Sequence, residues 1–245
     1  MKRLLYFVLA ALMALAVSCG KGDKTEEKVI KYGVDGVTPL PEAVDLGLPS
    51  GLKWASFNLG ASKPGESGDY YAWGETEPHY SSLNPLAWKD GMGAGYGWPN
   101  YKFGKDNEGP FSKYNETFLQ ATLETGPNGD DVASKALGGN WCMPTDNDWL
   151  ELKHNCTWTR KTMADGYPCN GYLFAGNGNS IFLPAAGRFS SVEYTFVGEN
   201  GYYWSSSFYP DELGHNRCFS LKSDDLLFFD MPWCKGLTIR PVCVE

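Results

Sequence analysis

Cysteines and histidines are the side chains of this 245-residue sequence with the greatest capacity for chemistry. His79, His154 and His215 are far apart in the sequence, and we expect them to be surface residues. The cysteines include no Cys-x-x-Cys pair, the spacing typical of zinc and thioredoxin-type sites. In an exported protein the six cysteines that follow Cys19 indicate disulfides, whose pairing the residues alone leave open. These six are Cys142, Cys156, Cys169, Cys218, Cys234 and Cys243.

Motifs for catalysis or for cofactor binding are weak in this chain. The glycine-rich run over 91–97 lacks the Lys-Ser/Thr of a phosphate-binding loop, so we interpret it as a flexible loop. No Gly-x-Ser-x-Gly nucleophile motif occurs. Asp224, Asp225 and Asp230 carry oxygen atoms that calcium accepts, but acids in a hairpin turn are more often solvated turn formers. The sequence therefore predicts no catalytic residue, no metal and no cofactor.

The first 41 residues have the composition of a leader followed by a tether. A positive start at Lys2 and Arg3, an apolar run and small residues before Cys19 resemble a bacterial lipoprotein signal. We expect residues 1–18 to be removed and Cys19 to be the lipidated first residue. Residues 19–41 are predicted to be a flexible, disordered tether. The alternative is an ordinary secretory signal in which Cys19 is incidental.

Net charge limits the partners that this chain can bind. The whole sequence carries −8, and loss of Lys2 and Arg3 with the signal leaves 19 basic against 29 acidic residues. Nucleic acids and anionic lipid surfaces are poor partners for such a chain, so membrane contact is expected through the lipid anchor alone. We expect an outer-membrane lipoprotein of the cell envelope, with its surface or periplasmic orientation left open.

A capped helix is the clearest structural signal in the sequence. Thr145 and Asp148 have the spacing of a capping box, which predicts a helix that begins at Asp146. A brief second helix is expected over 130–137, because glycines follow it directly. Three residues of the capped helix share one face and point into the core: Trp149, Leu152 and Cys156.

Short strands and turns account for most of the remaining chain. Glycine- and proline-containing turns separate alternating or apolar runs, which predicts antiparallel hairpins. The expected strands are 44–48, 52–59, 68–76, 172–174, 179–184, 201–208, 218–221, 226–229 and 237–244. Within 201–208, Tyr202, Trp204, Ser206 and Phe208 alternate onto one face. Few helices, many short strands and long loops predict an α+β class with a twisted, mostly antiparallel sheet.

Seven short motifs occur in one order along the presumed domain. They are Val44-Asp-Leu-Gly-Leu with Lys53-Trp-Ala, Tyr71-Ala-Trp-Gly-Glu-Thr, Gly138-Gly-Asn-Trp-Cys-Met-Pro-Thr, Asn155-Cys-Thr-Trp, Gly178-Asn-Ser-Ile-Phe-Leu-Pro-Ala-Ala-Gly, Gly201-Tyr-Tyr-Trp-Ser-Ser-Ser and Arg240-Pro-Val-Cys. Together they resemble the Fibrobacter succinogenes major paralogous domain of Bacteroidetes lipoproteins, over residues 42–245. The resemblance implies a C-type lectin-like fold with one or two short helices and long loops. It also implies kinship with formylglycine-generating enzymes.

The resemblance also implies a pairing of the cysteines into disulfides. A C-type lectin-like module ties its first helix to its final strand, and a middle strand to the loop before that final strand. The same order here implies pairs between Cys156 and Cys243 and between Cys218 and Cys234. Cys142 and Cys169 remain, and we expect them to form the third bridge.

The ligand surface follows from the same resemblance, because related modules expose their last hairpin to ligands. The predicted ligand-binding residues are Tyr209, Phe228, Phe229, Trp233, Asp224 and Asp225. Aromatic rings can stack on sugars or clamp a protein partner, and the alternative is that these rings belong to the core. Because Phe228 and Phe229 are adjacent in a strand, only one can point inward. Five tryptophans within the family motifs are expected in the core: Trp54, Trp73, Trp141, Trp149 and Trp204.

These observations together predict a lipid-anchored, non-catalytic protein that binds a glycan or protein ligand in the cell envelope. A structural or adhesin subunit, whose exposed aromatics contact another chain, is the alternative from a different class. A formylglycine-generating-like enzyme is the remaining alternative. It needs a reactive cysteine pair, and six bridged cysteines would leave none.

Overall fold

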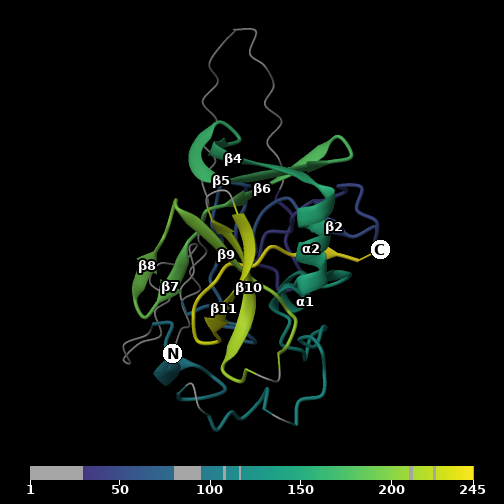
Figure 1. Ribbon diagram of the computed structural model, residues 1–245. Helices are drawn as coiled ribbons and strands as arrows, with labels where there is room; N and C mark the ends of the chain where they lie inside the picture. The colour runs from purple at the N-terminus through teal and green to yellow at the C-terminus, as the bar shows by residue number, and fades with distance from the viewer. Residues whose placement is uncertain are drawn as a thin grey trace, which may run out of the picture.

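The computed structural model describes residues 30–79, 95–106, 109–115, 117–209, 212–222 and 225–244. Two α-helices lie within these residues, α1 (Val132–Leu137) and α2 (Asp146–Asn155), with a 3-10 helix at Trp98–Asn100. The strands are β1 Ala43–Val44, β2 Lys53–Ala55, β3 Trp141–Cys142, β4 Thr157–Ala164, β5 Tyr167–Gly176, β6 Asn179–Pro184, β7 Arg188–Ser190, β8 Glu193–Thr195, β9 Asn200–Trp204, β10 His215–Lys222, β11 Asp225–Pro232 and β12 Val242–Cys243. The described strands pair antiparallel throughout, which confirms the α+β class (Figure 1).

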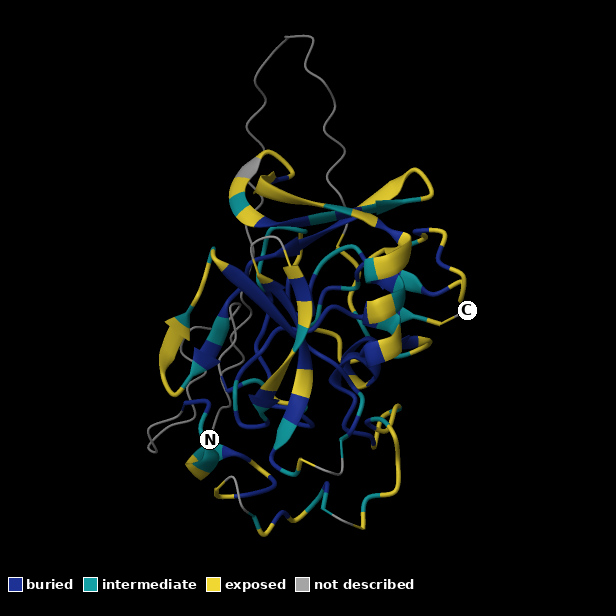
Figure 2. Cartoon of the chain, in the orientation of Figure 1, coloured by how far each residue is buried: buried dark blue, intermediate teal, exposed yellow. Residues whose placement is uncertain are grey.

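A three-stranded sheet in the order β11-β10-β9 separates two hydrophobic cores (Figure 1). Successive side chains of a strand point to opposite faces, so each strand supplies both cores. Tyr203 and Phe219 belong to the core on one face, whereas Tyr202, Trp204 and Cys218 belong to the core on the other. Figure 2 shows the resulting dark-blue strands at the middle of the molecule. The predicted alternation of Tyr202 and Trp204 is confirmed, and the sheet is a shared wall between the cores.

Helix α2 covers one face of this sheet. The Thr145 side chain accepts from the Asp148 backbone N–H, and the Asp148 carboxylate accepts from the Thr145 N–H at 2.7 Å. The predicted capping box and the start at Asp146 are therefore confirmed. The Trp149 ring stacks on Phe219 with the ring centroids 4.6 Å apart. Such a short helix depends on this burial more than on its intrinsic propensity.

The sheet β1-β2-β12-β3 brings the last strand of the chain between segments from earlier parts of the domain. Arg240, just before β12, is fully buried and lies among three acceptors from two other segments. Its Nε donates to Asn58 Oδ1 at 2.9 Å, its Nη1 to the Ala55 carbonyl at 2.8 Å, and its Nη2 to the Phe182 carbonyl at 2.5 Å. Burial lowers the pKa of Arg240 to about 10. One guanidinium thus joins the start, the middle and the end of the domain.

Two further antiparallel units complete the fold. The sheet β4-β5-β6 crosses the top of the molecule in Figure 1, and the hairpin β7–β8 lies beside β9. The predicted turn between β5 and β6 is confirmed at Asn177 and Gly178, whose φ angles of 51° and 74° suit a tight hairpin turn.

Only residues 30–41 of the tether predicted over 19–41 belong to the described part of the structure, because residues 1–29, including Cys19, lie outside it. Its described part forms a hydrogen-bonded turn, contrary to the expected disorder. Gly33 N–H donates to the Thr38 carbonyl at 2.8 Å, and Asp35 Oδ1 accepts from the Val37 and Thr38 amides at 3.0 and 2.9 Å. The Asp35 N–H also donates to Ala136 at the end of α1, which holds the turn against the domain.

Five strand predictions were too long: 44–48, 52–59, 68–76, 201–208 and 237–244. Over 68–76 only Tyr70 and Tyr71 form isolated bridges, and the bridge of Tyr71 is to Leu237. The final strand is limited to Val242–Cys243, because Pro241 has no N–H to continue the ladder. The brief helix predicted over 130–137 is confirmed as α1, with Asp131 as its N-cap. Neither described helix combines the length and the apolar character needed to cross a membrane.

Candidate functional site

The hairpin β10–β11 divides its adjacent phenylalanines between two faces, as predicted. Phe228 is half-buried and packs against Phe219, with the ring centroids 5.8 Å apart. Phe229 is 52% exposed and lies on the opposite face, 6.4 Å from the Tyr202 ring. Of these two residues, Phe229 is therefore the one that a ligand can reach.

Trp233 was predicted to bind ligand, and this prediction is wrong. Its side chain is 0% exposed, and its ring stacks on Trp73 with the centroids 5.4 Å apart. The backbone explains why: Trp233 N–H donates to the Gly214 carbonyl at 2.9 Å, and the Trp233 carbonyl accepts from Trp73 N–H at 2.8 Å. The chain turns inward at this point, so Trp233 belongs to the core. The five tryptophans expected in the core are also buried.

The other predicted ligand residues lie apart from Phe229. Tyr209 is half-buried, and its hydroxyl donates to the Asp146 carboxylate at the start of α2. The Arg217 guanidinium lies 4.2 Å from the Tyr209 ring centre, so both the ring and the hydroxyl are occupied. Asp225 is exposed at the first position of β11, and Asp224 lies outside the described residues. The five predicted residues that the structure describes therefore do not converge on one site.

A groove of about 500 Å³ lies beside Phe229, within the 300–1,000 Å³ typical of ligand sites. It is formed where β4, the β7–β8 hairpin and the β9–β10–β11 sheet meet. Residues with little or intermediate exposure form its floor: Arg188, Asn200 and Tyr202. Exposed residues form its rim: Arg160, Phe196, Glu199, Lys222 and Phe229. Three cations and three aromatic rings therefore face one cavity.

Arg188 on the groove floor is poorly satisfied as a hydrogen-bond donor. Its Nε is buried and has no partner among the described residues, and its Nη1 donates only to the Met231 thioether, at 3.1 Å. Its guanidinium carbon lies 5.4 Å from the Phe196 ring centre and 5.5 Å from that of Tyr202. Cation–π contacts hold this charge in place but leave its hydrogen-bonding capacity unused.

The backbone at Phe196 supports a role for this groove. Phe196 has a φ of 62°, in the left-handed region that a bulky residue seldom adopts and that costs about 1–2 kcal/mol. This conformation places the ring near both Arg188 and Tyr202. Residues with strained backbone conformations are more common at binding and active sites than elsewhere.

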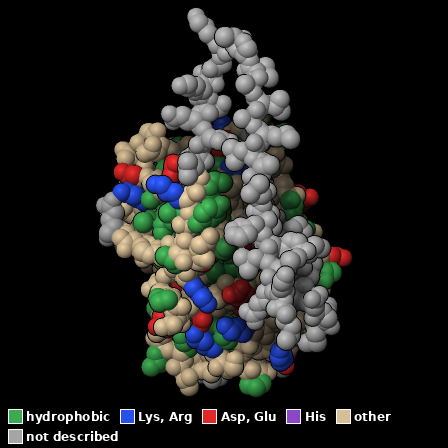
Figure 3. Space-filling view, turned by 180° about the vertical axis from the view of Figure 1, so that it is seen from behind, with side chains coloured by type: hydrophobic (Ala, Val, Ile, Leu, Met, Phe, Trp, Pro, Cys, Tyr) green, Lys and Arg blue, Asp and Glu red, His purple; other side chains and the backbone are tan. Residues whose placement is uncertain are grey.

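Sequence reasoning found one residue of this groove, Phe229, and missed the others. Tyr202 was predicted only to share one face of its strand with Trp204, Ser206 and Phe208, and most of its side chain is buried. Arg160, Arg188 and Lys222 come from three hairpins whose relative placement no local pattern encodes. The only feature of these three residues that the sequence shows is their positive charge in a chain of net charge −8. The rear face in Figure 3, by contrast, mixes blue and red side chains with hydrophobic ones.

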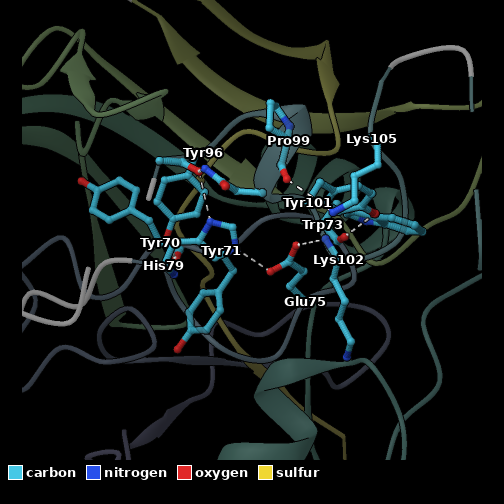
Figure 4. A network of polar contacts seen from close by, with 12 residues as sticks. Tyr70, Tyr71, Trp73, Glu75, His79, Tyr96, Pro99, Tyr101, Lys102 and Lys105 are labelled. Carbon is cyan, nitrogen blue, oxygen red and sulfur yellow. Dashed lines mark hydrogen bonds and ion pairs between the residues drawn. The ribbon is translucent and has the colours of Figure 1, made fainter. Parts of the chain in front are cut away.

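His79 was predicted to lie on the surface, and this prediction is also wrong. The residue is 5% exposed, and its Nε2 lies 2.7 Å from Glu75 Oε2. Its Nδ1 lies 3.3 Å from the Gly95 carbonyl, and its ring stacks on Tyr96 at 4.8 Å (Figure 4). The second Glu75 oxygen accepts from the Lys102 N–H at 2.8 Å. This network joins residues on both sides of 80–94, a segment outside the described residues.

The predicted disulfides are not formed. Five cysteines carry free thiols: Cys142, Cys156, Cys169, Cys218 and Cys234. Each of the three expected pairs includes at least one of them, so none of the three disulfides is present. Their neighbours explain this, since the Cys169 sulfur lies 3.2 Å from the Gly65 carbonyl, whereas Cys142 lies in β3 against β12. Burial raises the pKa of Cys142 to about 12 and that of Cys234 to about 11. Thiols of this kind are poor nucleophiles.

Metal binding has no evident site in the part of the chain that the structure describes, where no three His, Cys, Asp or Glu residues form a cluster that could hold an ion. No protein-family model matches this sequence, and neither a curated protein nor a solved structure shows significant similarity to it. The groove beside Phe229 is therefore the candidate site on its geometry alone.

Proposed function

We propose that this chain is a non-catalytic ligand-binding protein of the cell envelope, anchored by a lipid at Cys19, which binds a glycan or a protein through the groove beside Phe229. The observation that carries the proposal is the convergence on one cavity of exposed aromatic rings and of cations that form no ion pair with any described residue. Aromatic rings and arginines supply most of the binding energy at recognition surfaces. The proposed fold is C-type lectin-like. The pairing of the last strand with β2, near the start of the domain, supports it.

A structural or adhesin role is a second candidate, which one observation favours. Beside the groove, four residues in or next to the β7–β8 hairpin are 42–55% exposed although they are large and apolar: Val192, Tyr194, Phe196 and Val197. Apolar residues clustered at a surface are typical of contacts with another protein chain. The enzyme alternative draws no support from the described thiols, because burial raises the pKa of Cys218 and Cys234.

The test is a comparison of glycan and protein arrays probed with detergent-purified full-length protein. Replacement Phe229→Ala should abolish or strongly weaken the binding found. Tyr32→Ala is the matched control, because Tyr32 has the same 52% exposure but lies on the turn near the start of the domain. Equal binding by Phe229→Ala and the unchanged protein would contradict the groove as the site. Self-association that Phe196→Ala removes would favour the adhesin role.

A further inference from the structure

We infer that the groove beside Phe229 recognises a carboxylate-bearing sugar, with Arg188 as the residue that binds the carboxylate. This inference rests on the proposed function and specifies its ligand. Arg160, Arg188 and Lys222 line the groove with a single acid, Glu199. Among the described residues, no carboxylate lies within ion-pair distance of any of these three cations. In a chain with eight more acidic than basic residues, such an excess of positive charge implies an anionic ligand.

The guanidinium of Arg188 favours an anionic group that has two acceptor oxygens. A guanidinium presents its donors in a planar fork that matches a carboxylate, whereas Arg188 now uses only one donor, on a thioether. The half-buried position between Phe196 and Tyr202 fixes the plane of the fork before a ligand arrives. Such preorganisation lowers the entropy cost of binding.

The remaining residues favour a sugar over an acidic peptide. Asn200 is 8% exposed, and its Nδ2 donates to the Tyr202 hydroxyl at 3.2 Å, so both polar side chains are held at the groove floor. Planar amides and tyrosine hydroxyls pair well with vicinal sugar hydroxyls. The exposed rings of Phe196 and Phe229 stand on the rim, where each can pack against the apolar face of a pyranose.

The experiment measures binding of full-length protein to tri-galacturonate and to the matched neutral trigalactoside by calorimetry. We expect the uronide to bind at least about tenfold more tightly, with an affinity that falls as salt rises. Arg188→Gln should weaken uronide binding about tenfold or more, and Arg188→Lys should recover it only partly because the fork is lost. Arg217→Gln is the matched control and should bind normally, because Arg217 lies on β10 beside Tyr209 and does not line the groove.

Three outcomes separate this inference from the proposed function. Equal binding of both trisaccharides, unaffected by Arg188→Gln, would overturn the carboxylate inference and leave groove binding intact. Binding of oligoglutamate but of neither sugar would overturn the sugar and favour an acidic peptide. If Arg188→Gln fails to fold, the exposed double variant Arg160→Gln, Lys222→Gln replaces it. Unchanged uronide affinity in that variant would also contradict the inference.

Discussion

The imidazole of His79 and the carboxylate of Glu75 form a pair in the protein interior, with Nε2 and Oε2 2.7 Å apart. The other ring nitrogen lies 3.3 Å from the Gly95 carbonyl, so both nitrogens face acceptors. The pair therefore acts as a hydrogen-bonded clamp on the chain at both sides of 80–94.

Removal of the carboxylate should destabilise the domain. Glu75→Ala leaves His79 and the Lys102 N–H without their acceptor, and each buried donor that loses its partner costs about 1–3 kcal/mol. Glu77→Ala, the same change at an exposed residue two positions later, should stay within about 0.5 kcal/mol. Urea unfolding followed by fluorescence measures both. Equal midpoints for the two variants would show that the clamp contributes nothing.

Arg240 should be intolerant even of lysine. The substitution Arg240→Lys keeps the charge but cannot reach Asn58, Ala55 and Phe182 together, so buried acceptors lose their donors at about 1–3 kcal/mol each. We expect a loss of at least about 3 kcal/mol in the free energy of unfolding. Arg217→Lys, at a partly exposed site, is the control. A lysine variant as stable as the parent would mean that water satisfies these acceptors.

Substitutions at Trp233 and Phe229 should have opposite effects on stability and on ligand binding, although the two residues are only four positions apart. Trp233→Ala empties a core site and should cost about 3–5 kcal/mol. Phe229→Ala removes an exposed ring, so the thermal midpoint should hardly change while ligand binding falls. Thermal scans and binding isotherms on both variants check this contrast. A large thermal shift for Phe229→Ala would instead place its ring in the folding core.

Asp131 should make stability depend on pH in an unusual direction. Burial raises the pKa of this N-cap carboxyl to about 6, although the Ser134 and Met143 amides donate to it. Because the folded state then holds the proton more tightly than the unfolded state, this contribution falls as pH rises from about 4 to about 6, by about 3 kcal/mol. Asp131→Asn keeps a capping oxygen and should remove this slope.

The difference in free energy of unfolding between the unchanged protein and Asp131→Asn reports on Asp131 alone, because the other carboxyls are the same in both. Urea midpoints at pH 4, 5, 6 and 7 give that difference directly. A difference that stays constant over this range would show that the buried carboxyl is ionised throughout.

The thiols should be inert in the native protein. With pKa values raised to about 12 and about 11 by burial, Cys142 and Cys234 hold very little thiolate at pH 8. Alkylation at this pH should be at least tenfold slower than after unfolding in urea, as peptide mass spectrometry can measure. Disulfide-linked peptides in unreduced protein would contradict the free thiols of the structure.

Local signals predicted local structure well, and the site poorly. The capping box at Thr145, the turn at Asn177 and Gly178 and the alternation in β9 each depend on a few neighbouring residues, and all are present. Trp233 and His79 were misplaced because their burial depends on partners far along the chain. The groove was missed for the same reason, since it exists only where three hairpins meet.

The shared sheet has a consequence for how this sequence can change. Every residue of β9 is buried, and neighbouring positions serve opposite cores, so a one-residue shift in register would exchange the contents of both. Substitutions that leave both cores intact are thus limited to exposed positions of β11 and the hairpin turns, such as Phe229, Phe196 and Lys222. Substitutions at these positions should change the surface of the domain and leave both cores intact.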